Sequence, residues 1–205
     1  MKKRGSLIVI SGPSGAGKST LISRARTGIP GLEFSVSCTT RAPRPGEVNG
    51  REYFFISEEE FSRREAAGEF LECAGVFAHR YGTLKSQVME RLLAGHTVVL
   101  DIDVQGALSI RKACGLDPEL AACASFILIA PPDLETLEKR LRSRASDSEE
   151  QILKRLAGAR RELAHFRAYD FLIVNDDLDR AVNELLCVLR ALASRVSLIT
   201  EEIYS

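Results

Sequence analysis

The chain has 205 residues, with 28 basic and 28 acidic side chains, so its formal net charge is zero. This balance provides no overall field that would attract nucleic acid or an anionic membrane, and we expect neither as a partner. The five cysteines are scattered without C-x-x-C spacing, and no apolar run approaches the roughly 18 residues of a membrane span. We therefore expect reduced thiols and a cytoplasmic protein.

The first motif of the chain has the form G-x-x-x-x-G-K-[ST], which is typical of phosphate-binding loops. Glycines at this spacing let the backbone turn tightly, so that its N–H groups can point at a triphosphate. Lys18 can then reach the β- and γ-phosphates, and the Ser19 hydroxyl is placed to hold Mg²⁺. An apolar strand before the motif and a helix after it are the flanks that it requires. The sequence therefore predicts a nucleoside triphosphate site at Gly12, Pro13, Ser14, Gly15, Ala16, Gly17, Lys18 and Ser19.

Strand and helix patterns alternate along the chain, whose length suits one α/β domain with insertions. Short apolar runs typical of strands buried on both faces occur at residues 7–10, 97–102, 125–129 and 171–174. Helical patterns follow at residues 103–112, 133–144 and 177–195. This order favours an α/β fold of three layers, in which helices cover both faces of a parallel sheet.

The pattern changes between residues 34 and 95, where we expect a small antiparallel sheet with helices. Residues 34–38 alternate as in a strand, and Asn49-Gly50 predicts a hairpin turn. A capping box that begins at Ser57 predicts a short helix. Thr83 is the expected N-cap of a second helix, which ends before Gly95.

A second interruption, at residues 140–161, is rich in arginine. Ser146 and Glu149 have capping-box spacing, which predicts a new helix directly after the previous one ends. Two abutting helices of this composition are equally consistent with a solvated hairpin and with a mobile lid that closes over phosphates.

A loop after the 34–38 strand could bind a second phosphate group. Arg41 and Arg44 lie on this proline-stiffened loop with Tyr53 nearby, and paired guanidinium groups beside a phenol suit phosphate oxygens. Taken alone, the loop is more readily explained as an exposed basic segment paired with Glu47 and Glu52. Beside a triphosphate loop, however, a second phosphate site is what phosphoryl transfer requires.

Three carboxylates are candidates for chemistry or recognition. Asp101 lies at the carboxyl end of an apolar strand, where an acid would lie close to Mg²⁺ and the triphosphate. Asp103 begins the following turn and could cap a helix. Glu72 could accept the N1–H and exocyclic amine of guanine and would reject adenine, although alone it is more readily explained as a surface acid.

In their order and spacing, these motifs resemble the guanylate kinase family over nearly the whole chain. The matching stretches are residues 11–20, 34–41, 44–50, 100–106, 129–132 and 174–179. The resemblance implies a P-loop fold with a GMP-binding α+β insert at about residues 34–95 and a helical lid at about 140–161. The core would then comprise about residues 5–33, 96–139 and 162–205.

The resemblance also implies roles for individual residues. The phosphate loop through Thr20 would bind ATP, Asn175 would lie near the adenine, and Ser19 and Asp101 would hold Mg²⁺. The guanine of GMP is expected at Ser37, Glu72, Thr83 and Asp103, and the GMP phosphate at Arg41, Arg44, Tyr53 and Tyr81. Catalytic roles are implied for Lys18, Arg41, Arg44, Asp101, Arg140, Arg144 and Arg155.

The implied reaction is transfer of the γ-phosphoryl group of ATP to GMP, with dGMP as a related acceptor. A P-loop phosphotransferase with another acceptor is an alternative, because Glu72 alone decides the base. A non-catalytic module that uses the GMP cleft to bind a phosphopeptide is a second alternative. A GTPase is disfavoured, since the chain contains no Asn-Lys-x-Asp segment for guanine recognition.

Overall fold

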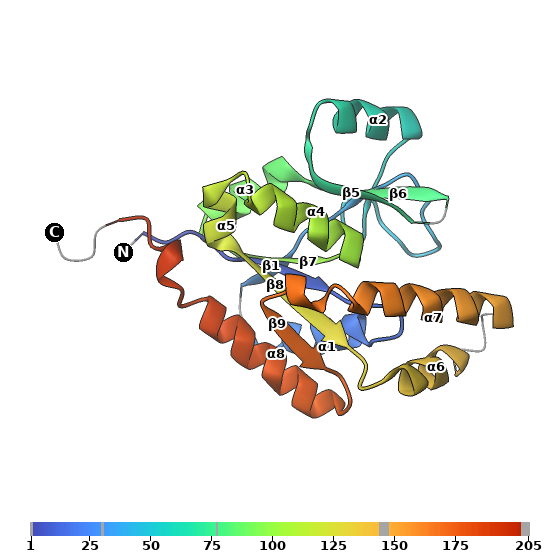
Figure 1. Ribbon diagram of the computed structural model, residues 1–205. Helices are drawn as coiled ribbons and strands as arrows, with labels where there is room; N and C mark the ends of the chain where they lie inside the picture. The colour runs from blue at the N-terminus through green and yellow to red at the C-terminus, as the bar shows by residue number, and fades with distance from the viewer. Residues whose placement is uncertain (1, 30, 77, 144–147, 202–205) are drawn as a thin grey trace.

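A parallel sheet of five strands forms the centre of the molecule (Figure 1). The computed structural model describes residues 2–29, 31–76, 78–143 and 148–201. The strands lie in the order β2-β7-β1-β8-β9, and every neighbouring pair is parallel, which confirms the predicted α/β core. The strands are β1 (Leu7–Ser11), β2 (Leu32–Phe34), β7 (Thr97–Asp101), β8 (Ala124–Ala130) and β9 (Phe171–Val174).

Helices cover both faces of this sheet and complete the predicted three layers (Figure 1). Because successive side chains of a strand point to opposite faces, Leu7 and Val9 of β1 enter one apolar cluster, while Ile8 and Ile10 enter the other. The first cluster is closed by α3 (Lys85–Leu93), α4 (Val104–Cys114) and α5 (Pro118–Cys123). The second is closed by α1 (Lys18–Arg26) and α8 (Leu178–Leu192).

A smaller sheet lies beside the core, between β2 and α3 in the chain (Figure 1). Its strands β5 and β6 are antiparallel, as are β3 and β6, but β3 pairs with β4 in parallel. A turn does form at Asn49-Gly50, where the Arg51 N–H donates to the Val48 carbonyl, but the predicted hairpin is wrong, because the bridge between Asn49 and Tyr53 is parallel. The Asn49 Oδ1 atom instead accepts a 2.8 Å hydrogen bond from the backbone N–H of Phe55 and stabilises a wider loop. The strands, in spatial order, are β4 (Phe54–Phe55), β3 (Cys38–Thr39), β6 (His79–Leu84) and β5 (Phe70–Val76).

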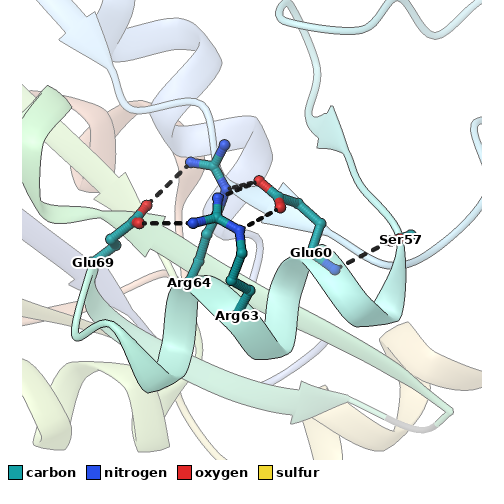
Figure 2. Close-up of polar contacts among 5 residues, drawn as sticks. All are labelled: Ser57, Glu60, Arg63, Arg64 and Glu69. Atoms are coloured by element: carbon teal, nitrogen blue, oxygen red, sulfur yellow. Dashed lines mark hydrogen bonds and ion pairs between the residues drawn. The ribbon is translucent and has the colours of Figure 1, made fainter.

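Helix α2 (Glu58–Ala66) packs on the small sheet and begins after Ser57, as predicted. The Ser57 Oγ atom accepts a 3.1 Å hydrogen bond from the Glu60 N–H. The Glu60 carboxylate accepts hydrogen bonds from Arg63 and Arg64, and both arginines also pair with Glu69 (Figure 2). These two arginines lower the pKa of Glu60 to about 2. The network ties the helix to the start of β5.

Helix α3 begins one residue later than predicted, because its N-cap is Leu84 and not Thr83. Thr83 is a buried member of β6 instead. Val88 and Leu92 of α3 belong to the same core cluster as Leu7. By its packing, this helix therefore belongs to the core, although its residues were expected within the insert.

Two further helices are α6 (Leu134–Arg142) and α7 (Glu149–Leu163), and α7 with only the last turn of α6 lies in the segment in which a lid was expected. Their buried side chains pack against one another. The N-cap of α7 is Ser148, which forms a capping box with Gln151, so the predicted cap at Ser146 is wrong. Ser146 itself, like Arg144, lies outside the described residues.

The last elements are short 3₁₀ helices, Phe166–Ala168 before β9 and Val196–Leu198 after α8. Lys3 forms a β-bridge with Ile199, so the first and last described segments lie side by side (Figure 1). Within the described ranges, no helix has both the length and the apolar character needed to cross a membrane.

Candidate active site

The loop between β1 and α1 has the backbone shape that its glycines permit. Gly15 and Gly17 have φ values of +92° and +90°, which side chains disfavour. At Gly17, the N-cap of α1, an added Cβ atom would also lie only 2.2 Å from the Asn175 Nδ2 atom. Helix α1 begins at Lys18, so its unpaired N–H groups and positive dipole end lie at the loop, ready for an anion.

Asn175 supports this loop from within the protein. Its residue is 6% exposed, and its Nδ2 atom donates a 2.8 Å hydrogen bond to the Ala16 carbonyl. Asn175 is also absent from the lining of the cleft. The Asn175 amide is thus engaged by the loop, and its expected place near the adenine stays a prediction.

Lys18 and Asp101 lie next to each other at the carboxyl ends of two neighbouring strands. The parallel register of β1 and β7 places Ile10 opposite Asp101, directly before the loop. The Lys18 Nζ atom donates a 2.8 Å hydrogen bond to the Gly12 carbonyl and lies 3.9 Å from Asp101 Oδ1. Desolvation raises the pKa of Asp101, and the Lys18 charge opposes that rise. The lysine thus favours the ionised carboxylate in the cleft.

The oxygen donors beside the loop suit Mg²⁺ held jointly with a nucleotide. Among the described residues, no group of three or more His, Cys, Asp or Glu side chains could hold a metal alone. Mg²⁺ is usually bound by one or two carboxylates together with substrate phosphates and water. Ser19 and Asp101 both line the cleft and supply donors of that kind.

Arg41 is held in place by a carboxylate and an aromatic ring. Its Nη1 and Nη2 atoms donate hydrogen bonds of 3.0 and 2.9 Å to Glu47 Oε2 and Oε1. Its guanidinium carbon lies 5.5 Å from the centroid of the Tyr53 ring. The Tyr53 and Tyr81 rings meet edge to face, with centroids 5.8 Å apart, and both line the cleft. The structure therefore brings Arg41 and both tyrosines together, with Glu47 filling the guanidinium fork.

Arg44 contributes to this arrangement through its backbone. Its N–H donates a 2.7 Å hydrogen bond to Glu47 Oε2, while its side chain is exposed. Hydrogen bonds from Arg41 and from the Arg44 backbone lower the pKa of Glu47. The ion pair with Glu47, which belonged to the alternative explanation of this loop, is thus present and is formed by Arg41. Glu52 pairs with Arg51 instead. Neither Arg41 nor Arg44 is among the residues that line the cleft.

Glu72 is a buried acid, so its interpretation as a surface residue is wrong: it is 7% exposed. The register of β5 and β6 places it opposite Thr83, whose Oγ1 atom donates a 2.7 Å hydrogen bond to Glu72 Oε1. Burial raises the pKa of Glu72, Thr83 opposes the rise, and the charge of Asp103 adds to it. Ser37 and Asp103 line the cleft with Glu72, so three of the four expected base-binding residues face one space.

The three predicted lid arginines have different positions. Arg155 of α7 lines the cleft, and its Nη1 atom donates a 3.2 Å hydrogen bond to Ser14 Oγ in the phosphate loop. Arg140 of α6 does not line it and donates a 2.8 Å hydrogen bond to the Asn175 carbonyl. Arg144 lies outside the described residues.

Helix α7 adds residues that our sequence interpretation missed. Gln151, Gly158 and Glu162 line the cleft together with Arg155, which was predicted, and the four are spaced along the chain by four, three and four residues. That spacing places them on one face of a helix, and it is the signal that could have found them. Burial raises the pKa of Glu162, and the charge of Lys18 opposes the rise.

One cleft of about 820 Å³ connects these groups. The phosphate loop with Lys18, Ser19 and Asp101 forms one end, and Glu72 with Tyr53 and Tyr81 forms the other. A parallel sheet with a phosphate loop after its central strand, facing a second polar site across one cleft, defines a P-loop kinase of nucleoside monophosphates.

Comparison with known proteins identifies the family. The guanylate kinase family profile matches residues 4–192, and the chain therefore belongs to the guanylate kinase family. The guanylate kinase of Caldanaerobacter subterraneus is 46% identical over 196 residues, which cover 96% of this chain and 92% of that protein. The guanylate kinase of Cereibacter sphaeroides is 47% identical over 191 residues, which cover 93% of this chain and 88% of that protein. The crystal structure of Anaplasma phagocytophilum guanylate kinase superposes with a TM-score of 0.72 at 33% identity, covering 96% and 90%.

Proposed function

We propose that this cleft transfers the γ-phosphoryl group of ATP to GMP, giving ADP and GDP. The chain is an ATP:GMP phosphotransferase by family. One observation supports the assignment of this activity to the cleft: the same cleft contains both the phosphate loop and a buried carboxylate suited to guanine. The free thiols of all five cysteines favour a reducing cytoplasm as its location.

The donor end would hold ATP through the loop N–H groups, from Gly12 to Thr20, and through Lys18 on the β- and γ-phosphates. Ser19 and Asp101 would hold Mg²⁺, which supplies charge neutralisation on the phosphates when it is bound. Asn175 keeps the loop in shape from behind.

The acceptor end would read GMP at two points. Arg41, Arg44, Tyr53 and Tyr81 would bind the phosphate, since guanidinium forks and phenols donate to its oxygens. Glu72, with Ser37, Thr83 and Asp103, would receive the base. Guanine presents two donors, N1–H and the exocyclic amine, to a carboxylate, whereas adenine presents an acceptor at N1. A carboxylate already held by Thr83 therefore favours guanine and leaves adenine unpaired.

Phosphoryl transfer needs little more than alignment and charge neutralisation. We assign the neutralising role to Arg155, which already contacts the phosphate loop, and a supporting role to Arg140. Movement of α7 towards the small sheet would exclude water and so suppress ATP hydrolysis. Arg144 retains its proposed role as a third lid arginine.

The acceptor is tested by measuring ADP formation from ATP and Mg²⁺ in the presence of GMP, dGMP, AMP, UMP or no acceptor. We expect turnover with GMP, weaker turnover with dGMP, and little with AMP, UMP or water. A preference for AMP would contradict the role of Glu72 and favour a kinase with another acceptor. Fast ADP formation without any acceptor would indicate a hydrolase. No ADP formation with any of the acceptors would indicate a binding module.

The role of Glu72 is tested by Glu72→Gln, which replaces one acceptor oxygen by a donor. We expect the KM for GMP to rise about 100-fold with a smaller change in kcat, because a charged hydrogen-bond partner is lost. Glu69→Gln, on a half-exposed carboxylate that lies three residues earlier and outside the cleft lining, is the matched control and should leave both constants unchanged.

The raised pKa of Glu72 adds a pH signature to this test. GMP binding by the wild-type enzyme should weaken as the pH falls through that raised pKa, because the carboxyl becomes protonated. A buried carboxyl with a raised pKa lowers the stability of the folded state as the pH increases from its ordinary pKa to the raised one. Glu72→Gln should therefore remove the acid limb of the GMP profile and leave the Tm at neutral pH equal or higher.

A further inference from the structure

The first turn of α4 meets strand β5 at the expected base site. This turn belongs to the core and β5 to the small sheet, so the seam between the two parts of the molecule lies at this site. Gly106 lies in the turn, is buried, and has no positive φ that would require glycine. Helices disfavour glycine, and alanine would be the better residue on local grounds alone. Its presence therefore needs a reason outside the helix.

The missing side chain of Gly106 leaves the space that the Glu72 carboxylate occupies. A Cβ atom at this position would lie 2.8 Å from Glu72 Oε2, closer than a carbon and an oxygen can pack. The next nearest atoms are Ile102 Cδ1 at 3.3 Å and Asp103 Oδ1 at 3.4 Å. All three neighbours line the cleft.

Gly106 also holds the second acid of this site. Its N–H donates a 2.8 Å hydrogen bond to Asp103 Oδ1, which caps α4. Glu72 is meanwhile fixed from its other side, because Thr83 donates to Oε1. One carboxylate oxygen is therefore set by Thr83 and the other by the absence of a side chain at Gly106.

We infer that Gly106 is a positioning residue that determines specificity for the guanine base. It leaves space for the Glu72 carboxylate in the position where it would bind guanine, and it orients Asp103. The inference rests on the proposed role of Glu72 in binding GMP. Gly106 itself need not contact the nucleotide. Through Gly106, the contact between α4 and β5 becomes part of the base-binding site.

The test is Gly106→Ala, examined by steady-state kinetics with GMP and by GMP binding without ATP. The three atoms nearest the added methyl group are all ends of side chains, so Glu72 can yield by a few tenths of an ångström at little cost to folding. We expect the KM and Kd for GMP to rise about tenfold, since small displacements of a recognition group have effects of this order. The KM for ATP should not change, and the Tm should stay level or increase.

Gly75→Ala is the matched control, because Gly75 lies on β5 and an added Cβ atom would meet nothing within 4 Å. It should leave GMP binding unchanged. The double variant Gly106→Ala/Glu72→Gln distinguishes action through Glu72 from any other route: the two effects should be far from additive.

Three outcomes would overturn the inference. The first is wild-type GMP affinity in Gly106→Ala while Glu72→Gln is impaired. The second is an equal effect of Gly106→Ala in the Glu72→Gln background, which would mean that it acts elsewhere. The third is a fall of many degrees in Tm, which would make Gly106 a packing residue. A Glu72→Gln variant with normal GMP kinetics would instead contradict the proposed function itself.

Discussion

The two ends of the cleft are built from different chemical groups. The donor end consists mainly of backbone, with N–H groups of the loop and of α1 shaped by glycines and supported by Asn175. The acceptor end consists of side chains, and two of the charged ones have fixed neighbours: Arg41 has Glu47, and Glu72 has Thr83. Backbone groups recognise phosphates that all nucleoside triphosphates share, whereas paired side chains can select one base. Generality and selectivity are thus divided between the two ends.

The largest effect should come from removing the only lysine of the loop. Lys18→Ala deletes the charge beside the transferring group, and we expect kcat to fall about 1000-fold, within the range for loss of an electrostatic contact in the transition state. The KM for GMP should change little, because Lys18 belongs to the donor end. Lys112→Ala, an exposed lysine on α4, is the control. A large rise in the KM for GMP would break the division between the two ends.

A smaller effect is expected from Asn175→Ala, which removes the support of the loop without touching a phosphate. Leaving the buried Ala16 carbonyl unpaired should lower the free energy of unfolding by about 1–3 kcal/mol, as measured by urea denaturation. The KM for ATP should rise about tenfold as the loop loses its shape. Asn183→Ala, on the exposed side of α8, should change neither quantity. A selective loss of affinity for adenine nucleotides over other triphosphates would restore the adenine contact for Asn175.

The smallest effect concerns Glu47, the partner of Arg41. Glu47→Gln should loosen the guanidinium over Tyr53 and raise the KM for GMP about fivefold, because a partly exposed ion pair contributes little. Because the pKa of Glu47 is lowered, the pair persists into mildly acidic solution and is lost only as the pH falls through that lowered value.

Glu60→Gln provides the control for Glu47, since Glu60 also accepts from two arginines but lies on α2, outside the cleft (Figure 2). It should leave GMP kinetics unchanged. A decrease in the KM for GMP in Glu47→Gln would show that Glu47 competes with the phosphate, in which case the acceptor end would not be preorganised by its own pairs.

The donor end was largely predictable from the sequence because its signals are local. A strand, a glycine loop and a helix occur within 20 residues of chain, and Lys18 follows from the motif. Asn175 shows the limit of this approach, because its hydrogen bond to Ala16 joins residues 159 positions apart. The buried carbonyl that it satisfies cannot be seen in a motif.

The acceptor end depends on pairings that the sequence does not encode locally. Glu72 is buried because β5 pairs with β6, and as an isolated acid it had no mark of burial. The predicted cap at Thr83 was wrong for the same reason, since Thr83 belongs to strand β6 and the helix begins after Leu84. Ser57, whose cap requires only its own helix, was predicted correctly.

The hydrogen bond from Arg140 to the Asn175 carbonyl joins α6 to the floor of the phosphate loop. Gly15 strengthens this connection, because Leu137 and Leu141 of α6 lie against it. In the proposed closure, α6 would therefore stay with the ATP pocket, and α7 with Arg155 would move. A substitution or an engineered crosslink that strains α6 should therefore change the affinity for ATP more than the access of GMP to the cleft.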